Sequence, residues 1–132
     1  MATRSNIGIL QDDGTIKAIY CHWDGYPEGV GTTLASYYTT REKVEALLNL
    51  GDFSSLGETL EKTAETADPT DEERKARVFN SVNEWRDYAR EQWAEYLYLY
   101  QRQEYGLKGY EWNYLEITDY WKQIPTKLIQ TV

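Results

Sequence analysis

Two apolar runs near the start of the chain predict a pair of β-strands. They cover residues 6–10 and 15–23, and Asp13-Gly14 lies between them. An Asp-Gly pair flanked by such runs is the strongest short-range signal of a β-hairpin. Because side chains alternate along a strand, the second run divides into two faces. One face carries Ile16, Ala18, Tyr20 and His22, and the other carries Lys17, Ile19, Cys21 and Trp23.

The residues that follow show helical spacing. Residues 32–38 predict a short helix, and residues 41–50 predict a second helix with Gly51 at its C-terminal cap. Thr39 and Glu42 have the spacing of a capping box, in which a hydroxyl and a carboxylate bind free backbone N–H groups. We therefore expect the second helix to begin just after Thr39.

Two segments without strong periodicity come next. Residues 52–57 are expected to form a turn that packs Phe53 and Leu56 on the core. Residues 58–69 are acidic, polar and poor in large apolar groups. Such a composition favours a loop, with a weak helix as the alternative.

A longer helix is predicted over residues 70–94. Thr70 and Glu73 have the spacing of a second capping box, and the acidic side chains near them oppose the helix dipole. Apolar side chains then recur at steps of four and three residues, which is typical of one buried helix face. That apolar stripe consists of Val78, Val82, Trp85 and Ala89.

Strict alternation returns in residues 95–101 and 111–118, which predict two strands joined by a bend at 105–109. We expect the aliphatic face of these strands to meet the helices, which leaves an aromatic face on the other side of the sheet. The tail, residues 119–132, contains Pro125 and is expected to end as a short edge segment. The aromatic face consists of Tyr96, Tyr98, Tyr100, Trp112 and Tyr114.

Together these elements predict a single α+β domain over residues 1–132. Its sheet has four strands, is mainly antiparallel, and is built from two hairpins with about three helices packed on one face. Four parts follow one another along the chain: the N-terminal hairpin and helices (5–57), the acidic loop (58–69), the long helix (70–94), and the C-terminal hairpin and tail (95–132).

The composition favours a folded acidic protein. Hydrophobic residues make up 41% of the chain and aromatic residues 14%, and 22 acidic against 14 basic side chains give a net charge of −8. This balance argues against nucleic-acid binding, which needs a basic patch. It fits a partner with a basic surface, or solubility alone. A single Cys excludes an internal disulfide, and no apolar run is long enough to span a membrane. We expect a cytoplasmic protein without a cofactor.

Residues 19–31 are the most informative stretch for chemistry, because they hold the single His and the single Cys among aromatic, Gly and Pro residues. A nucleophilic Cys21–His22 pair needs the two side chains within hydrogen-bond reach, but adjacent strand residues point in opposite directions. A zinc site would need further Cys or His ligands. An anion-binding glycine loop lacks the spacing of the known phosphate motifs. The pattern therefore favours a shaped aromatic corner without a metal.

Two interpretations of the aromatic face stay open. It is either covered, by residues 119–132 or by a partner subunit in a homo-oligomer, or exposed as a platform on which a ligand stacks. Both the corner and this face are therefore candidate binding surfaces. The candidate binding residues are His22, Trp23, Asp24, Tyr26, Tyr96, Tyr98, Tyr100, Trp112 and Tyr114.

The N-terminal part of the chain resembles a family of small, mostly uncharacterised proteins of bacteriophages and prophages. The most specific match is the run Tyr20-Cys21-His22-Trp23-Asp24-Gly25-Tyr26-Pro27-Glu28-Gly29-Val30-Gly31, and the close match covers roughly 40% of the chain. The other matching residues are Ile7-Gly8-Ile9, Asp13-Gly14-Thr15-Ile16, Ile19, Leu34, Tyr37 or Tyr38, Lys43-Val44 and the segment from Leu50 to Gly57. Many members of that family carry a basic segment of the Arg-Asp-Arg-Gly-Glu type after this part, whereas residues 58–75 here are acidic.

The resemblance implies a phage accessory protein in the cytoplasm of a bacterial host, and it implies no known reaction. The functional hypothesis is an interaction protein that binds and inhibits a host protein, such as a component of a defence system. One alternative is a protein that sequesters a nucleotide-type immune signal in a pocket made by the glycine loop and the aromatic residues. A second alternative is a small hydrolase that uses Cys21 or His22.

Overall fold

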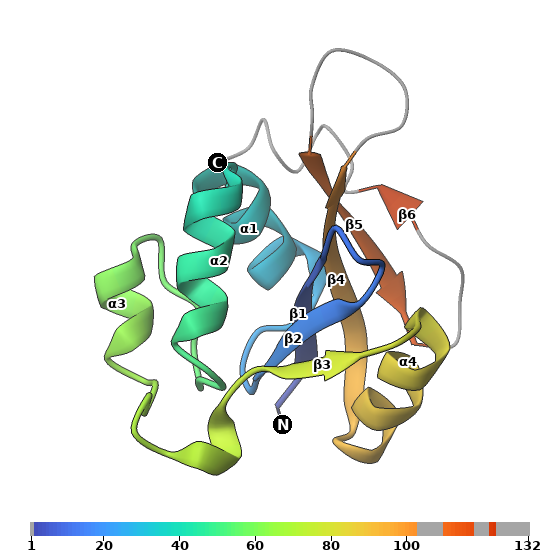
Figure 1. The fold of residues 1–132 in the computed structure, drawn as a ribbon. Coiled ribbons are helices and arrows are strands. Elements are labelled where there is room, and N and C mark those ends of the chain that lie inside the picture. The colour runs from blue at the N-terminus through green and yellow to red at the C-terminus, as the bar shows by residue number, and fades with distance from the viewer. Residues whose placement is uncertain (1, 103–109, 118–121, 124–132) are drawn as a thin grey trace.

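The centre of the molecule is a mixed six-stranded sheet with the strand order β3-β2-β1-β4-β5-β6 (Figure 1). The computed structural model describes residues 2–102, 110–117 and 122–123. Strand β1 pairs in parallel with β4, and every other neighbouring pair is antiparallel. The strands are β1 (Arg4–Leu10), β2 (Ile16–Cys21), β3 (Arg77–Phe79), β4 (Ala94–Arg102), β5 (Tyr110–Glu116) and β6 (Lys122–Gln123).

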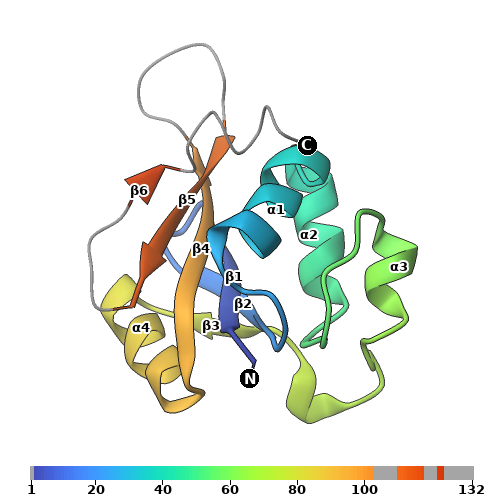
Figure 2. The same cartoon turned by 180° about the vertical axis from the view of Figure 1, so that it is seen from behind.

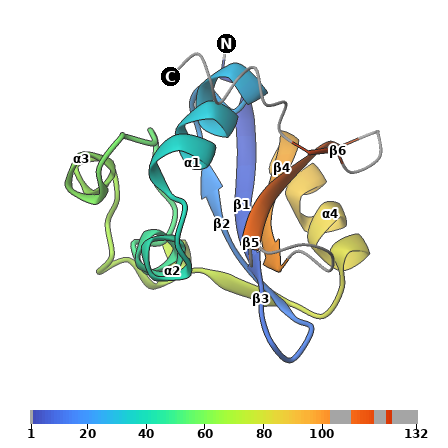
Figure 3. The same cartoon turned by 90° about the horizontal axis from the view of Figure 1, so that it is seen from above.

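Helices cover both faces of this sheet. In Figure 3, α1, α2 and α3 lie on one side of the sheet and α4 on the other, and Figure 2 shows the same layers from behind. The prediction of four strands with helices on one face is therefore wrong in both respects, although the α+β class is confirmed. The helices are α1 (Thr32–Tyr37), α2 (Arg41–Asn49), α3 (Leu60–Ala64) and α4 (Val82–Glu91), with a π-helical turn at Pro27–Gly31 and a 3₁₀ turn at Glu72–Arg74.

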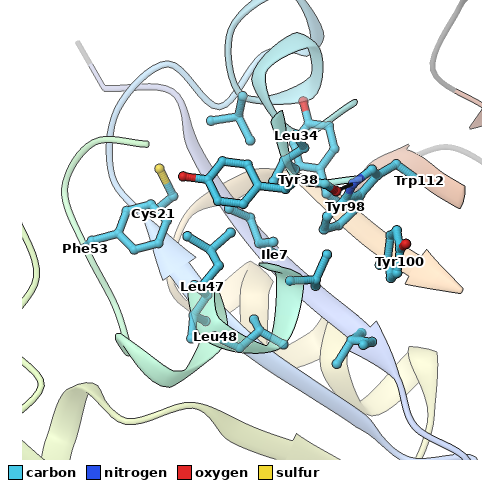
Figure 4. Close-up of a cluster of buried hydrophobic side chains, with 14 residues drawn as sticks. Ile7, Cys21, Leu34, Tyr38, Leu47, Leu48, Phe53, Tyr98, Tyr100 and Trp112 are labelled. Atoms are coloured by element: carbon cyan, nitrogen blue, oxygen red, sulfur yellow. Dashed lines mark hydrogen bonds between the residues drawn. The ribbon is translucent and has the colours of Figure 1, made fainter. Parts of the chain in front are cut away.

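Both faces need cover because both carry large side chains. The β4 side chains Tyr98 and Tyr100 belong to one buried cluster, and Leu97 and Leu99 belong to the other. The aromatic cluster packs beneath α1 and α2, where Leu34 and the α2 residues of Figure 4 meet it. The aliphatic cluster packs around the fully buried Trp85 and Ala89 of α4. Each cluster removes apolar area from water, so the sheet is stabilised from both sides.

The N-terminal hairpin and its caps follow the sequence pattern closely. Strands β1 and β2 join through Gly14, which has φ +87, and Ile16 and Ile19 lie on opposite faces as expected. Gly51 has φ +75 and ends α2, as its predicted cap requires. The N-terminal cap of α2 is Thr40, whose hydroxyl accepts from the Lys43 N–H, so the predicted Thr39 cap is off by one residue.

The predicted helix over residues 70–94 is wrong in its first half. This part of the chain forms the 3₁₀ turn and then β3, which pairs with the first residues of β2. Val78 is 57% exposed rather than buried, whereas Phe79 faces the core. Helix α4 begins only after Ser81, whose hydroxyl accepts from the Glu84 N–H. The open edge of β2 therefore outweighs the local helical pattern.

The acidic segment also departs from its prediction as a loop. It contains α3, capped by Thr59, and the fully buried Thr63 hydroxyl hydrogen-bonds within it and to Tyr38. The predicted bend at 105–109 and most of the predicted tail lie outside the described residues. Residues 122–123 of that tail do pair with β5, at the edge of the sheet, as expected. Within the described residues, no helix is both long and apolar enough to cross a membrane.

Candidate functional site

The exposed corner at residues 22–31 follows directly after β2. The chain past Cys21 runs beside another segment, because the N–H of His22 donates to the Phe53 carbonyl (3.3 Å) and the N–H of Trp23 donates to the Ser54 carbonyl (2.9 Å). Phe53 is 3% exposed, and with Leu56 it packs on the aromatic cluster as the sequence predicted. The turn at 52–57 thus fixes one side of the corner.

Four further hydrogen bonds fix the bend itself. Asp24 has φ +57, which Asp tolerates better than most residues, and its carbonyl accepts from the N–H of Val30 at 2.9 Å. The N–H of Gly25 donates to the Thr3 carbonyl, and the Gly25 carbonyl accepts from the Tyr98 hydroxyl at 2.7 Å. The N–H of Gly29 donates to the backbone carbonyl of Tyr26. The corner is therefore held to Thr3, just before β1, and to β4.

Gly29 is required at its position by a close approach of the backbone. A Cβ atom there would collide with the Asp24 carbonyl oxygen and would lie 3.1 Å from a ring carbon of Tyr26. The π-helical turn that contains Gly29 leads directly into α1, and the Thr33 hydroxyl donates to the Gly29 carbonyl. The corner can therefore be this tight only with Gly at residue 29.

The corner presents two aromatic side chains to solvent. Trp23 is 45% exposed and Tyr26 is 39% exposed. The Tyr26 hydroxyl donates to Asp24 Oδ1 at 3.2 Å, and this hydrogen bond, together with the carboxylate charge, raises the pKa of Tyr26. The His22 ring meets Trp23 edge to face, with 4.6 Å between ring centroids. Three of the four predicted corner residues are thus exposed, and His22 is half-buried behind them.

The aromatic sheet face is covered rather than exposed. Tyr98, Tyr100 and Trp112 are all buried, and each donates a hydrogen bond to a backbone carbonyl of the first half of the chain. The acceptors are Gly25, Thr39 and Tyr38, and Figure 4 shows Trp112 beside Tyr38. Among the described residues, the cover comes from the corner, from α1 and the residues just after it, and from α2. The predicted cover by the tail lies outside the described residues.

The other two members of the aromatic face differ from these three. Tyr96 and Tyr114 are half-buried at the edge of the same cluster. Their rings lie 6.5 Å and 6.2 Å from the Tyr98 ring. Of the nine candidate binding residues, the structure therefore brings His22, Trp23, Asp24 and Tyr26 together at one corner, and it places Tyr98, Tyr100 and Trp112 in the core.

The Cys21–His22 pair lacks the geometry of a nucleophile and its base. Cys21 is fully buried in the aromatic cluster, and its burial raises the pKa of the thiol to about 12. His22 is on the opposite face of the strand, where its Nδ1 lies 2.8 Å from the Tyr20 hydroxyl. Within the described part of the chain, no group of His, Cys, Asp and Glu side chains is arranged to hold a metal ion. Cys21 and His22 are therefore not arranged as a nucleophile and its base.

Sequence reasoning missed a polar cleft beside His22. Asp52 and Arg74 line it, and Arg77 pairs with Asp52 at 3.3 Å. No local pattern marked this cleft, because its lining residues come from three segments that are separate in the sequence.

Comparison of the chain with protein-family models, curated proteins and solved structures finds no match.

Proposed function

We propose that this chain is a phage-encoded interaction protein that inhibits a host bacterial protein by direct binding through the corner at residues 22–31. The observation that carries the proposal is the exposure of Trp23 and Tyr26 on a backbone that six hydrogen bonds hold in place. Large aromatic side chains contribute most of the binding energy in protein interfaces. A rigid loop loses little conformational entropy when it binds.

The negative charge of the corner and of the whole chain favours a partner with a basic surface. Asp24 and Glu28 are exposed in the same corner, where both carboxylates act on Tyr26, and the whole chain carries a net charge of −8. Aromatic faces and carboxylates together suit Arg and Lys side chains, through cation–π contact and ion pairing. A strong net charge of opposite sign also speeds the encounter with such a partner. A host protein that uses a basic groove is therefore the proposed target, and the phage origin follows from the sequence resemblance.

Site-specific photo-cross-linking tests the proposal. A photoreactive phenylalanine analogue replaces Trp23 in the full chain, and in a matched control it replaces Trp93, which is 78% exposed in the turn between α4 and β4. Both proteins are expressed in the infected host and irradiated. The proposal expects one host protein cross-linked at position 23 and not at position 93. Equal cross-linking at both positions, or none at position 23, would contradict it.

A further inference from the structure

The polar cleft is a hollow of about 350 Å³ beside the end of β2. Its size is at the lower end of the range typical of small-molecule sites. It is bounded by the end of β2 on one side, by the turn after α2 on another, and by the 3₁₀ turn before β3. The residues that line the cleft are Tyr20, His22, Asp52, Phe53, Ser54 and Arg74.

Asp52 holds the walls of this cleft together. Its Oδ1 accepts from the N–H of Tyr20 at 2.8 Å, and its Oδ2 lies 3.3 Å from Arg77. Its own N–H donates to the Arg74 carbonyl at 2.7 Å. The Asp52 carboxylate is thus already neutralised by a guanidinium and a backbone donor. This carboxylate has a structural role. Because its charge is compensated by these partners, it repels a bound anion only weakly.

Hydrogen-bond donors from separate segments surround the hollow. The Arg74 guanidinium has half of its side chain exposed and pairs with Asp71 at 3.2 Å, in a surface salt bridge that contributes little stability and can exchange partners. Ser54 adds a hydroxyl. The Tyr20 hydroxyl lies 2.8 Å from His22 Nδ1. When Nδ1 accepts that bond, the proton of the neutral imidazole is on Nε2, so His22 is also a donor.

The cleft is less acidic than the chain as a whole. Two guanidiniums, those of Arg74 and Arg77, meet two carboxylates, those of Asp71 and Asp52, in a protein with a net charge of −8. An anion is therefore repelled less here than by the net charge of the chain. Guanidinium groups match the oxygens of phosphate in particular.

We propose that this cleft binds the phosphate monoester group of a small metabolite, with Arg74, His22 and Ser54 as its donors. The rings of Tyr20 and His22, tilted by 52° with 6.0 Å between centroids, offer apolar surface to the sugar or base next to the phosphate. This inference goes beyond the proposed protein contact, because neither Trp23 nor Tyr26 lines the cleft. The two proposals share only His22, and each can be tested without the other.

NMR can test this proposal directly, because the chain contains a single His and its ring signals need no further assignment. The His22 ring signals of the full-length protein are recorded while AMP, ribose 5-phosphate, inorganic phosphate or adenosine is added at constant ionic strength. The three phosphate compounds are expected to shift these signals in a saturable manner, and adenosine is expected to leave them unchanged. Equal shifts with adenosine, or no shift with any phosphate compound at millimolar concentration, would overturn the proposal.

Matched arginine variants locate the phosphate. Arg74→Ala is expected to weaken AMP binding by about tenfold or more, because it removes a charged hydrogen-bond donor. Arg90→Ala is the control, since Arg90 is a similarly exposed arginine on α4, where it pairs weakly with Asp87 at 4.0 Å. Unchanged AMP affinity in Arg74→Ala, or an equal loss in both variants, would contradict the assignment. A thermal unfolding curve like that of the parent protein confirms that each variant is folded.

Discussion

The hydroxyl of Tyr98 on β4 donates a 2.7 Å hydrogen bond to the carbonyl oxygen of Gly25 in the corner. Tyr98 is fully buried, and burial raises the pKa of its hydroxyl, so this group remains a neutral donor. The bond links the centre of the sheet to a surface loop that is far away in the sequence. It explains how an exposed corner can be as well fixed as the core beneath it.

Tyr98→Phe is expected to lower the free energy of unfolding by about 1–2 kcal/mol, because the buried Gly25 carbonyl loses its side-chain donor. Urea denaturation measures the change. Tyr114→Phe, on a half-buried ring of the neighbouring strand, is the control and should have a smaller effect. Equal losses in the two variants would mean that the bond to Gly25 does not hold the corner.

Gly29→Ala is expected to destabilise the protein by about 2 kcal/mol, because the added methyl group collides with the Asp24 carbonyl. The same measurement applied to Gly14→Asn should show little change. Gly14 also has a positive φ, but a Cβ atom there meets open space and Asn tolerates the left-handed region. A harmless Gly29→Ala would show that the corner is loose.

Trp93→Gly is expected to raise the free energy of unfolding by about 1 kcal/mol. Trp93 has φ +64, which is unfavourable for a bulky residue, and its side chain is largely exposed. Trp93→Ala is the matched control, because it removes the ring and keeps a Cβ atom in the left-handed region. If both variants gain or lose the same stability, the backbone conformation is not the cause.

The Cys21 thiol is expected to resist alkylation near neutral pH in the folded protein and to react once denaturant unfolds it. Its pKa rises from the ordinary value of 9.0 to about 12 because the side chain is buried. The folded state therefore holds the thiol proton more tightly than the unfolded state. The resulting stability is fully present below the ordinary pKa and is lost as the pH rises toward 12.

Cys21→Ala provides the control for this pH dependence. The variant should lose stability less steeply than the parent protein above the ordinary thiol pKa, although the buried tyrosines, whose pKa values are also raised, contribute in both proteins. Rapid alkylation of the native protein would contradict the buried position of Cys21. It would also return the hydrolase alternative to consideration.

Local patterns in the sequence were sufficient to predict the hairpin of β1 and β2, the alternation of β4 and β5, and the C-terminal cap of α2 at Gly51. They were not sufficient for β3, because three residues are too few for a period to be visible and Val78 fitted a helical stripe. The parallel pairing of β1 with β4 could not be predicted either. It depends on α4 covering the second face of the sheet, and no residue of β1 signals that.

The candidate site was predicted unevenly for a similar reason. The corner is continuous in the sequence, so its Gly, Pro and aromatic residues marked it directly. Tyr98, Tyr100 and Trp112 looked like a binding face because their partners, the carbonyls at 25, 38 and 39, are invisible in a side-chain pattern. The polar cleft joins His22, Asp52 and Arg74 from segments that only the folded chain brings together.

The central claim is that the corner at residues 22–31 binds a host protein. The most direct test is to measure how tightly variants of the corner bind the host protein identified by cross-linking. Trp23→Ala/Tyr26→Ala should bind that partner at least about tenfold more weakly than the parent chain, since interface aromatics dominate binding energy. Trp93→Ala should bind with the parent affinity, and all three proteins should unfold at similar denaturant concentrations. Unchanged affinity in the double variant, or an equal loss in Trp93→Ala, would contradict the account.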